Sequence, residues 1–139
     1  QALGLRLQSV QISAGASLEN KFEKGTNERA QALIVVTDAL LYSHRGRIVA
    51  LAAANRLPAM YFFRQFVEEG GLMSYAPSDT DLFRRAAAYV DRVLKGANPR
   101  DMPIVQPTKF ELVINLRTAR TLGLDLPPAL LTRADDVIE

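Results

Sequence analysis

The sequence predicts an α/β fold built on a parallel sheet, and three observations carry this prediction. Apolar runs over residues 32–36, 59–63 and 72–75 have the length of strands. Each run is followed by a helical pattern, a turn or a capping residue, and β-then-α units in series place their strands side by side and parallel. A chain of 139 residues that is 48% hydrophobic and 23% charged is typical of one globular domain.

The amino-terminal elements follow from these patterns. Residues 5–12 alternate imperfectly between apolar and polar, which is typical of a strand near a sheet edge, and Ser17 is a candidate cap for the helix after it. Because residues 32–36 are continuously apolar, we expect a strand buried on both faces. A helix over 43–56 then leads to the strand over 59–63.

A short turn or helix over 64–69 precedes the strand over 72–75. The clearest helix follows, over 79–95, capped by Ser78 or Asp79 and carrying two adjacent apolar stripes. Gly96 marks its end.

The carboxyl-terminal residues predict shorter elements. After a proline-rich loop, residues 109–116 alternate weakly and indicate another strand. Asn115 is a candidate cap for a short helix that ends at Gly123, and a last helical turn begins at Pro127 and ends near Asp135.

Composition excludes several classes of site. The chain has no cysteine and one histidine, His44, which rules out thiol catalysis, disulfides and zinc sites built from several cysteines or histidines. No phosphate-binding loop, dinucleotide fingerprint or serine-nucleophile motif is present, so we expect no enzyme activity and no cofactor. A net charge of +2 is too small to indicate nucleic acid binding. No apolar run reaches the roughly 20 residues that a membrane span needs.

Polar and aromatic residues follow the predicted parallel strands. Thr37 and Asp38 come directly after the strand over 32–36. Ligands of open parallel sheets bind outside the carboxyl ends of the strands. Asp38 is therefore a candidate ligand-binding residue, and an equally good candidate for a helix cap.

The next two strand ends carry the other candidates. The end of the strand over 59–63 carries Tyr61, Phe62 and Arg64, which could hold an aromatic or carboxylated small molecule. Because strand residues alternate between the two faces of a sheet, we expect some of the aromatic side chains to lie in the core. Ser74 and Tyr75 end the third strand. The three strand ends should converge on one rim of the sheet.

Several segments resemble a known family. Residues 55–61 and 66–75, which include Gly-Gly-Leu-Met-Ser-Tyr, and residues 106–111, Gln-Pro-Thr-Lys-Phe-Glu, are similar to the substrate-binding proteins of bacterial ABC importers. The subgroup is a largely uncharacterised one with the type I periplasmic-binding fold. The resemblance covers nearly the whole chain and corresponds to the carboxyl-terminal half of the family.

The resemblance implies an incomplete two-lobe architecture. Residues 1–77 would form the carboxyl-terminal, three-layer parallel-sheet lobe, and residues 78–104 a crossover helix and linker that pack on a mostly missing amino-terminal lobe. Residues 105–139 would return to the first lobe. A start at Gln1 rather than Met agrees with a piece of a longer or processed polypeptide.

The implied function is a solute receptor in the periplasm, with or without a lipid anchor. It would capture an amino acid or related compound between two lobes and deliver it to the membrane permease of an ABC importer. Phe62 departs from the family pattern, in which we expect a polar residue. A ligand-sensing module of a signalling protein and a flavodoxin-like enzyme domain remain as alternatives. Without the other lobe, the apolar helix over 79–95 should make this chain self-associate.

Overall fold

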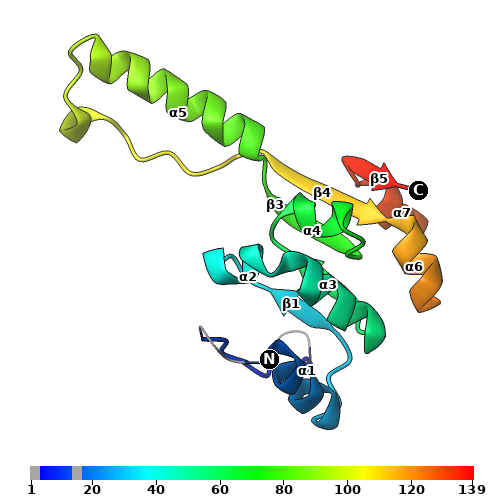
Figure 1. Cartoon of the computed structure of the whole chain (residues 1–139). Helices are drawn as coiled ribbons and strands as arrows, with labels where there is room; N and C mark the ends of the chain where they lie inside the picture. The colour runs from blue at the N-terminus through cyan, green and yellow to red at the C-terminus, as the bar shows by residue number, and fades with distance from the viewer. Residues whose placement is uncertain (1–3, 14–16) are drawn as a thin grey trace.

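The computed structural model describes residues 4–13 and 17–139, and it shows a mixed α/β lobe from which a long arm projects (Figure 1). The lobe is built on a five-stranded sheet with the order β1-β2-β3-β4-β5. The strands are β1 (Leu33–Val35), β2 (Ala59–Tyr61), β3 (Met73–Pro77), β4 (Phe110–Asn115) and β5 (Asp136–Ile138). Strands β1 to β3 are parallel, β4 runs antiparallel to β3, and β5 is parallel to β4. The predicted α/β class is confirmed, and the sheet is parallel except where β3 pairs with β4.

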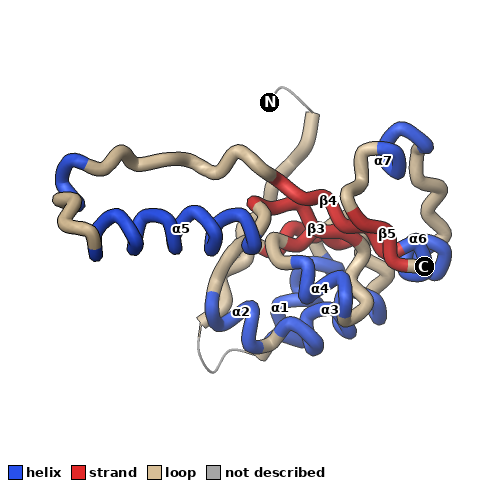
Figure 2. The backbone as a smooth tube through the Cα atoms, turned by 90° about the horizontal axis from the view of Figure 1, so that it is seen from above, coloured by secondary structure: helices blue, strands red, loops and turns tan. Residues whose placement is uncertain are grey.

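Helices cover the two faces of the sheet unequally (Figure 2). The helices α1 (Leu18–Asn27), α3 (Arg45–Ala54) and α4 (Arg64–Glu68) lie on one face. The short α7 (Pro128–Thr132) lies on the other face, beside β4 and β5. The core sits under the first group, where Phe22, Ile48 and Phe66 pack against Val35 and Tyr61.

Several predicted helix caps are confirmed. The side chains of Ser17, Ser78 and Asn115 accept hydrogen bonds from the backbone N–H groups of Asn20, Asp81 and Thr118. Each of these bonds satisfies a donor that the first turn of a helix leaves without a partner. Gly123 ends α6 (Leu116–Leu122) at φ 71°, a conformation that favours glycine.

The predictions for the amino-terminal elements need three corrections. Residues 5–12 form no strand, because they lie outside the ladder and Leu7 is largely exposed. Strand β1 is not buried on both faces: it is an edge strand, and Ile34 is 66% exposed. The helix predicted over 43–56 is observed as α3, which begins at Arg45, and a separate short helix, α2 (Ala39–Ser43), precedes it.

One carboxyl-terminal prediction is also wrong. The last helical turn does not extend to Asp135, because α7 stops at Thr132 and Asp136 already begins β5. Strand β5 has only three residues and pairs with β4 from Asp136 to Ile138. So short a strand carries no alternation that a sequence pattern could reveal, and the pairing alone defines it.

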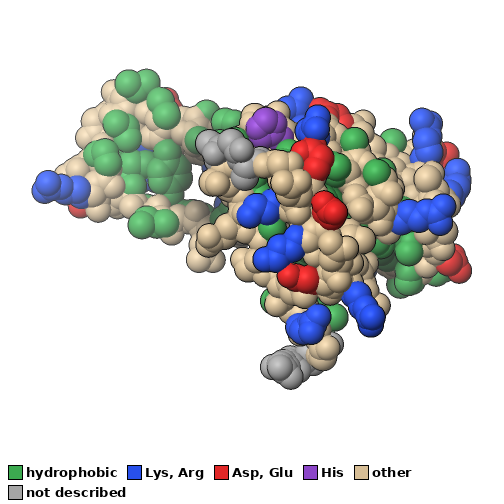
Figure 3. All heavy atoms as spheres, turned by 60° about the horizontal axis from the view of Figure 1, so that its bottom comes forward, with side chains coloured by type: hydrophobic (Ala, Val, Ile, Leu, Met, Phe, Trp, Pro, Cys, Tyr) green, Lys and Arg blue, Asp and Glu red, His purple; other side chains and the backbone are tan. Residues whose placement is uncertain are grey.

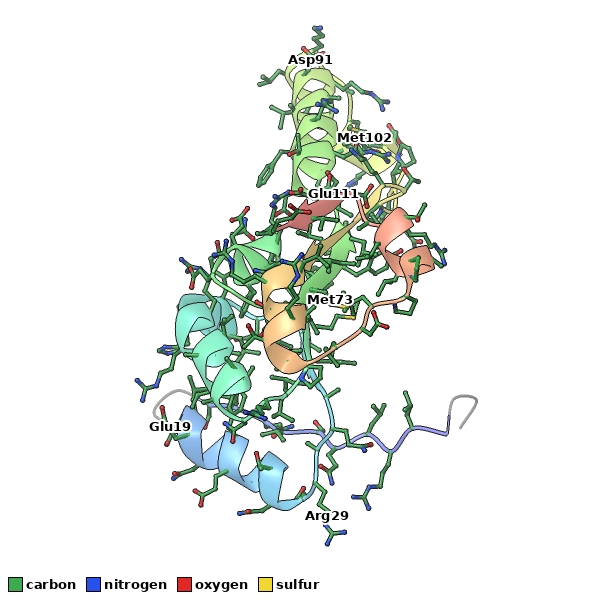
Figure 4. All side chains as sticks on the ribbon, turned by 90° about the vertical axis from the view of Figure 1, so that its right-hand side faces the viewer. Glu19, Arg29, Met73, Asp91, Met102 and Glu111 are labelled. Atoms are coloured by element: carbon green, nitrogen blue, oxygen red, sulfur yellow. The ribbon has the colours of Figure 1, made fainter. Side chains whose placement is uncertain are left out.

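The arm comprises residues 78–109. It consists of α5 (Asp79–Leu94), a 3-10 turn (Pro99–Asp101) and an extended return to β4. The Tyr89 hydroxyl donates to the carbonyl of Pro103 at 2.6 Å and ties the two limbs together. Between the limbs lies a cleft of about 630 Å³, which Leu82 and Met102 help to line. Figure 4 shows Asp91 and Met102 on the two limbs, far from Met73 in the sheet.

No residue of α5 is buried. Among the described residues, no helix is long and apolar enough to cross a membrane.

Candidate functional site

The carboxyl ends of β1, β2 and β3 lie at one edge of the sheet. Val35 pairs with Tyr61, and Tyr61 pairs with Ser74, so the three strands are level. The residues one step further along the chain, Val36, Phe62 and Tyr75, therefore stand side by side at this edge. We call this edge of the sheet the rim. Thr37 and Asp38 follow β1 at the rim, and Arg64 follows β2.

Asp38 carries the first carboxylate after the end of β1 in the sequence. It is the N-cap of α2, and its Oδ1 accepts the backbone N–H groups of Leu40 at 2.8 Å and Leu41 at 3.1 Å. The helix-cap alternative is thus observed. Asp38 and Thr37 are both exposed, so capping leaves the Asp38 carboxylate accessible at the rim.

Aromatic side chains end β2. Phe62 is 38% exposed and meets Phe63 edge to face, with 5.6 Å between the ring centroids. Phe63 in turn meets Tyr42 of α2 at 5.1 Å. Edge-to-face pairs at these distances are a preferred aromatic geometry. The pairs hold Phe62 in place, and the residue remains partly exposed to solvent.

A second aromatic platform lies on β3 and β4. Tyr75 is 49% exposed and stacks on Phe110, with centroids 5.5 Å apart and an interplanar angle of 21°. Phe110 was not predicted as a site residue. The alternation over 109–116 indicates the strand, but only the antiparallel pairing of Tyr75 with Leu112 and Pro77 with Phe110 brings the two rings together.

Arg64 is engaged within the protein. Its Nε donates to Glu68 and its Nη2 to Asp136, both at 2.8 Å. The bond to Glu68, followed by the bond to Asp136, raises the pKa of the Arg64 guanidinium above its ordinary value. The charge of Arg64 is therefore already paired, and a ligand carboxylate would have to displace Glu68 or Asp136 to reach it.

Two predicted site residues lie inside the lobe. Tyr61 is 2% exposed and its ring stacks on Phe66 at 4.7 Å. Burial raises the pKa of its hydroxyl. Ser74 is equally buried and pairs with Tyr61 in the row that faces the helices. A methyl group on Gly71 would come within 2.5 Å of the Tyr61 ring, so this close approach requires glycine.

The rim thus offers aromatic surface and a carboxylate. The aromatic surface comes from Phe62 and from the Tyr75–Phe110 pair, and the carboxylate from Asp38. Such a set suits a small molecule that carries an apolar or aromatic group and a positive charge. Among the described residues, no cluster of three or more histidine, aspartate or glutamate side chains could hold a metal ion.

The arm starts at the rim. Strand β3 ends at Pro77 and α5 begins at Asp79, so the helix leaves from the same edge and points away from the lobe (Figure 1). Hydrophobic side chains gather on the arm, as Figure 3 shows.

Comparisons with known structures confirm the architecture. A conserved domain protein from Vibrio cholerae aligns with a TM-score of 0.78 and 23% identity over 86% of this chain and 40% of its own. A Streptococcus pneumoniae ABC domain in complex with L-Trp aligns with a TM-score of 0.79 and 27% identity over 87% of this chain and 41% of its own. A Clostridium difficile substrate-binding protein with adhesive properties aligns with a TM-score of 0.62 and 21% identity, over 91% and 43%.

The chain spans 40–43% of the length of these three structures. No curated protein matches the chain. The family model of the ABC transporter substrate binding proteins matches residues 1–138, which is all but the last residue. The chain therefore belongs to the ABC transporter substrate-binding protein family.

Proposed function

We propose that this chain is one lobe of a solute receptor of an ABC importer, and that the rim is its share of the solute site. The observation that carries the proposal is the convergence of Asp38, Phe62 and Tyr75 at the carboxyl ends of three parallel strands, in a chain of the substrate-binding family. Ligands of open α/β sheets bind at this edge.

The proposed solute is an amino acid with an apolar or aromatic side chain. The exposed faces of Phe62 and Tyr75 supply contact area for that side chain. The Asp38 carboxylate pairs with the α-ammonium group. Arg64, already paired with Glu68 and Asp136, is not needed for the charge balance on this lobe. The pneumococcal structure with L-Trp supports this class, because that protein is similar in fold and sequence.

Capture would involve a second lobe of a longer polypeptide. The structures to which the chain aligns are more than twice as long as the aligned part. The arm would pack on that lobe and act as one of the connections about which the lobes close on the solute. The closed form would dock on a membrane permease outside the cytoplasm. This mechanism requires no enzymatic step.

A tryptophan titration tests the proposal directly. The chain contains no tryptophan, so the fluorescence anisotropy of added L-tryptophan reports only the ligand. We expect weak binding, with a dissociation constant of about 1 mM, because one lobe encloses only part of the solute. Micromolar binding by this chain alone would contradict the two-lobe mechanism. A complete lack of binding at millimolar concentrations would contradict the proposed solute class.

Two variants distinguish a role of Asp38 in binding from the general effect of removing one negative charge. Asp38→Asn should weaken binding about tenfold or more, because a hydrogen bond to a charged group is worth about 1.5–3 kcal/mol. Asparagine is as good a helix cap as aspartate, so α2 should persist. Asp125→Asn is the matched control, since Asp125 is exposed on the loop between α6 and α7. Equal affinities of the two variants would contradict a role for Asp38.

A further inference from the structure

The short helix α2 determines where the Asp38 carboxylate lies. Asp38 Oδ1 accepts the N–H groups of Leu40 and Leu41, so the carboxylate is fixed relative to α2 and moves with it. No residue of this five-residue helix is buried. Figure 2 shows α2 at the end of the lobe from which the arm leaves, which is the side of the rim. The position of the carboxylate at the rim therefore depends on the contacts that fasten α2 to the lobe.

Two side chains of α2, Leu41 and Tyr42, pack against the core. Tyr42 makes the contacts that depend on orientation. Its ring meets the ring of Phe63 with 5.1 Å between the centroids and that of Phe66 with 6.4 Å, at interplanar angles of 74° and 70°. Edge-to-face pairs bring the positive edge of one ring to the negative face of another. They therefore favour one placement of the Tyr42 ring, whereas the aliphatic contact of Leu41 has no preferred direction.

A guanidinium group also contacts Tyr42. The Cζ of Arg45 lies 4.9 Å from the centroid of the Tyr42 ring, which is a cation–π distance, and its Nη1 donates to the Tyr42 carbonyl oxygen at 3.4 Å. The Nε of Arg45 lies 2.6 Å from Oε1 of Glu69, the residue at the end of α4. Arg45, the first residue of α3, thus links α2 to α4. All these contacts involve the ring or the backbone of Tyr42 and not its hydroxyl.

We propose that Tyr42 is the positioning residue of the rim: its ring fixes α2 and thereby holds the Asp38 carboxylate where the α-ammonium group of the solute binds. The same ring contacts Phe63, which in turn meets Phe62 at 5.6 Å. One side chain thus connects the carboxylate of the site with its aromatic surface. This inference rests on the proposed function, because it assigns Tyr42 a role in the binding of the proposed solute.

A positioning role predicts a loss of selectivity and not a uniform loss of affinity. Indole-3-propionate has the aromatic ring and the carboxylate of L-tryptophan but lacks the α-ammonium group. If Tyr42 acts through Asp38, the loss of its ring should weaken the binding of L-tryptophan and leave the binding of indole-3-propionate almost unchanged. A side chain that only stabilised the lobe would affect both ligands equally.

Ligand-observed NMR titrations of matched variants test this selectivity. Tyr42→Leu keeps an apolar side chain but removes the ring. It should raise the dissociation constant of L-tryptophan about threefold to tenfold, up to the effect of losing one hydrogen bond to a charged group. Its dissociation constant for indole-3-propionate should change by less than about twofold. Tyr42→Phe keeps the ring and should bind both ligands as the unchanged chain does. Tyr89→Leu, which removes a tyrosine ring from the arm, is the matched control.

Three outcomes of the titrations would overturn the proposal. Equal weakening of both ligands in Tyr42→Leu would mean that Tyr42 acts through the aromatic surface or through the stability of the lobe. An unchanged affinity for L-tryptophan in Tyr42→Leu would mean that the position of Asp38 does not depend on the ring. A Tyr42→Phe variant as weak as Tyr42→Leu would assign the effect to the hydroxyl and not to the ring contacts.

Amide hydrogen exchange measures the fastening of α2 without any ligand. The N–H groups of Leu40 and Leu41, which donate to Asp38, should exchange about tenfold faster in Tyr42→Leu and at the original rate in Tyr42→Phe. The N–H of Asn115, which donates to the carbonyl of Leu72 in the sheet at 2.8 Å, should exchange at the same rate in all variants and so report that the lobe stays folded.

The exchange rates also separate failure of this inference from failure of the proposed function. Unchanged exchange at Leu40 and Leu41 in Tyr42→Leu would overturn the inference even if L-tryptophan binds at the rim. Faster exchange in Tyr42→Leu, together with no binding of L-tryptophan by the unchanged chain, would contradict the proposed function. The role of Tyr42 in solute binding would then be contradicted with it.

Discussion

The lobe and the arm both contain helices with apolar side chains, yet only helices of the lobe bury any of them. In the lobe, Ile48 of α3 and Phe66 of α4 are almost inaccessible to solvent, whereas no residue of α5 is buried. Periodicity indicates that a helix has an apolar side, but it does not identify the surface that covers that side. The difference between the two regions therefore lies in the partners that the fold supplies.

The largest expected effect compares two phenylalanines. Phe66→Ala in the lobe should lower the free energy of unfolding by about 3–5 kcal/mol, because it removes a ring that stacks on Tyr61 and leaves a cavity. Phe83→Ala on the arm should change the stability of the isolated monomer by about 0.5 kcal/mol or less. Urea unfolding at low protein concentration measures both. Similar losses for both variants would show that the arm is packed in solution.

Two glycines test how tightly the lobe is packed. Gly71→Ala should destabilise by about 1–3 kcal/mol, because its Cβ would come within 2.7 Å of the carbonyl oxygen of Phe66 as well as meeting the Tyr61 ring. Gly25→Ala in α1 is the control, since its Cβ meets nothing within 4 Å. It should stabilise by about 0.5–1 kcal/mol through helix propensity. Thermal unfolding of the two variants gives the difference, and a stable Gly71→Ala would indicate a looser core.

The coupling energies of ion pairs should differ less between the lobe and the arm. The Arg64–Asp136 pair joins α4 to β5, whereas the Lys95–Asp91 pair links neighbouring turns at the end of α5. Double-mutant cycles should give about 0.2–1 kcal/mol for the first pair and about 0.3–0.5 kcal/mol for the second, because all four side chains are well exposed. High salt should reduce both values. A coupling of several kcal/mol for Arg64 would mean that its surroundings are drier than the structure shows.

The smallest effect concerns Glu19, which contacts Arg47 and so ties α1 to α3. Hydrogen bonds from its own backbone N–H, from Ser17 and from Arg47 hold the pKa of Glu19 below 4.5. A lowered pKa means that this carboxylate contributes stability above about pH 4.5 and loses it as the pH falls through the folded-state value. Glu19→Gln should remove this part of the acid dependence of unfolding. An NMR titration of Glu19 that gave a pKa of 4.5 or higher would contradict the contact.

Local patterns predicted the elements well where the cause is local. Ser17, Ser78 and Asn115 cap helices in the structure because capping involves only the next three residues. The strand ends that carry Asp38, Phe62 and Tyr75 could be located because apolar runs and turn residues mark them. Their alignment at one rim followed from the parallel arrangement of β-then-α units.

Features that depend on distant partners could not be predicted. Phe110 stacks on Tyr75 only because of the antiparallel register of β4. Arg64 forms a hydrogen bond with Asp136, which is 72 residues away in the sequence. Residues 5–12 have the pattern of a strand but no partner in the sheet. Tyr61 and Phe62 are neighbouring aromatic residues that point to opposite faces of the strand. The helices cover only one of these faces, so Tyr61 is buried in the core and Phe62 is exposed at the rim.

The sequence by itself determined the α/β class, the helix caps, the position of the three parallel strand ends and the family of the chain. These depend on residue type, spacing and short-range hydrogen bonds, which are readable along the chain. The tertiary structure alone decided which aromatic rings are accessible, that the charge of Arg64 is already paired, and that no residue of α5 is buried. Burial and charge pairing are properties of surfaces brought together from distant residues, so they exist only once the chain has folded.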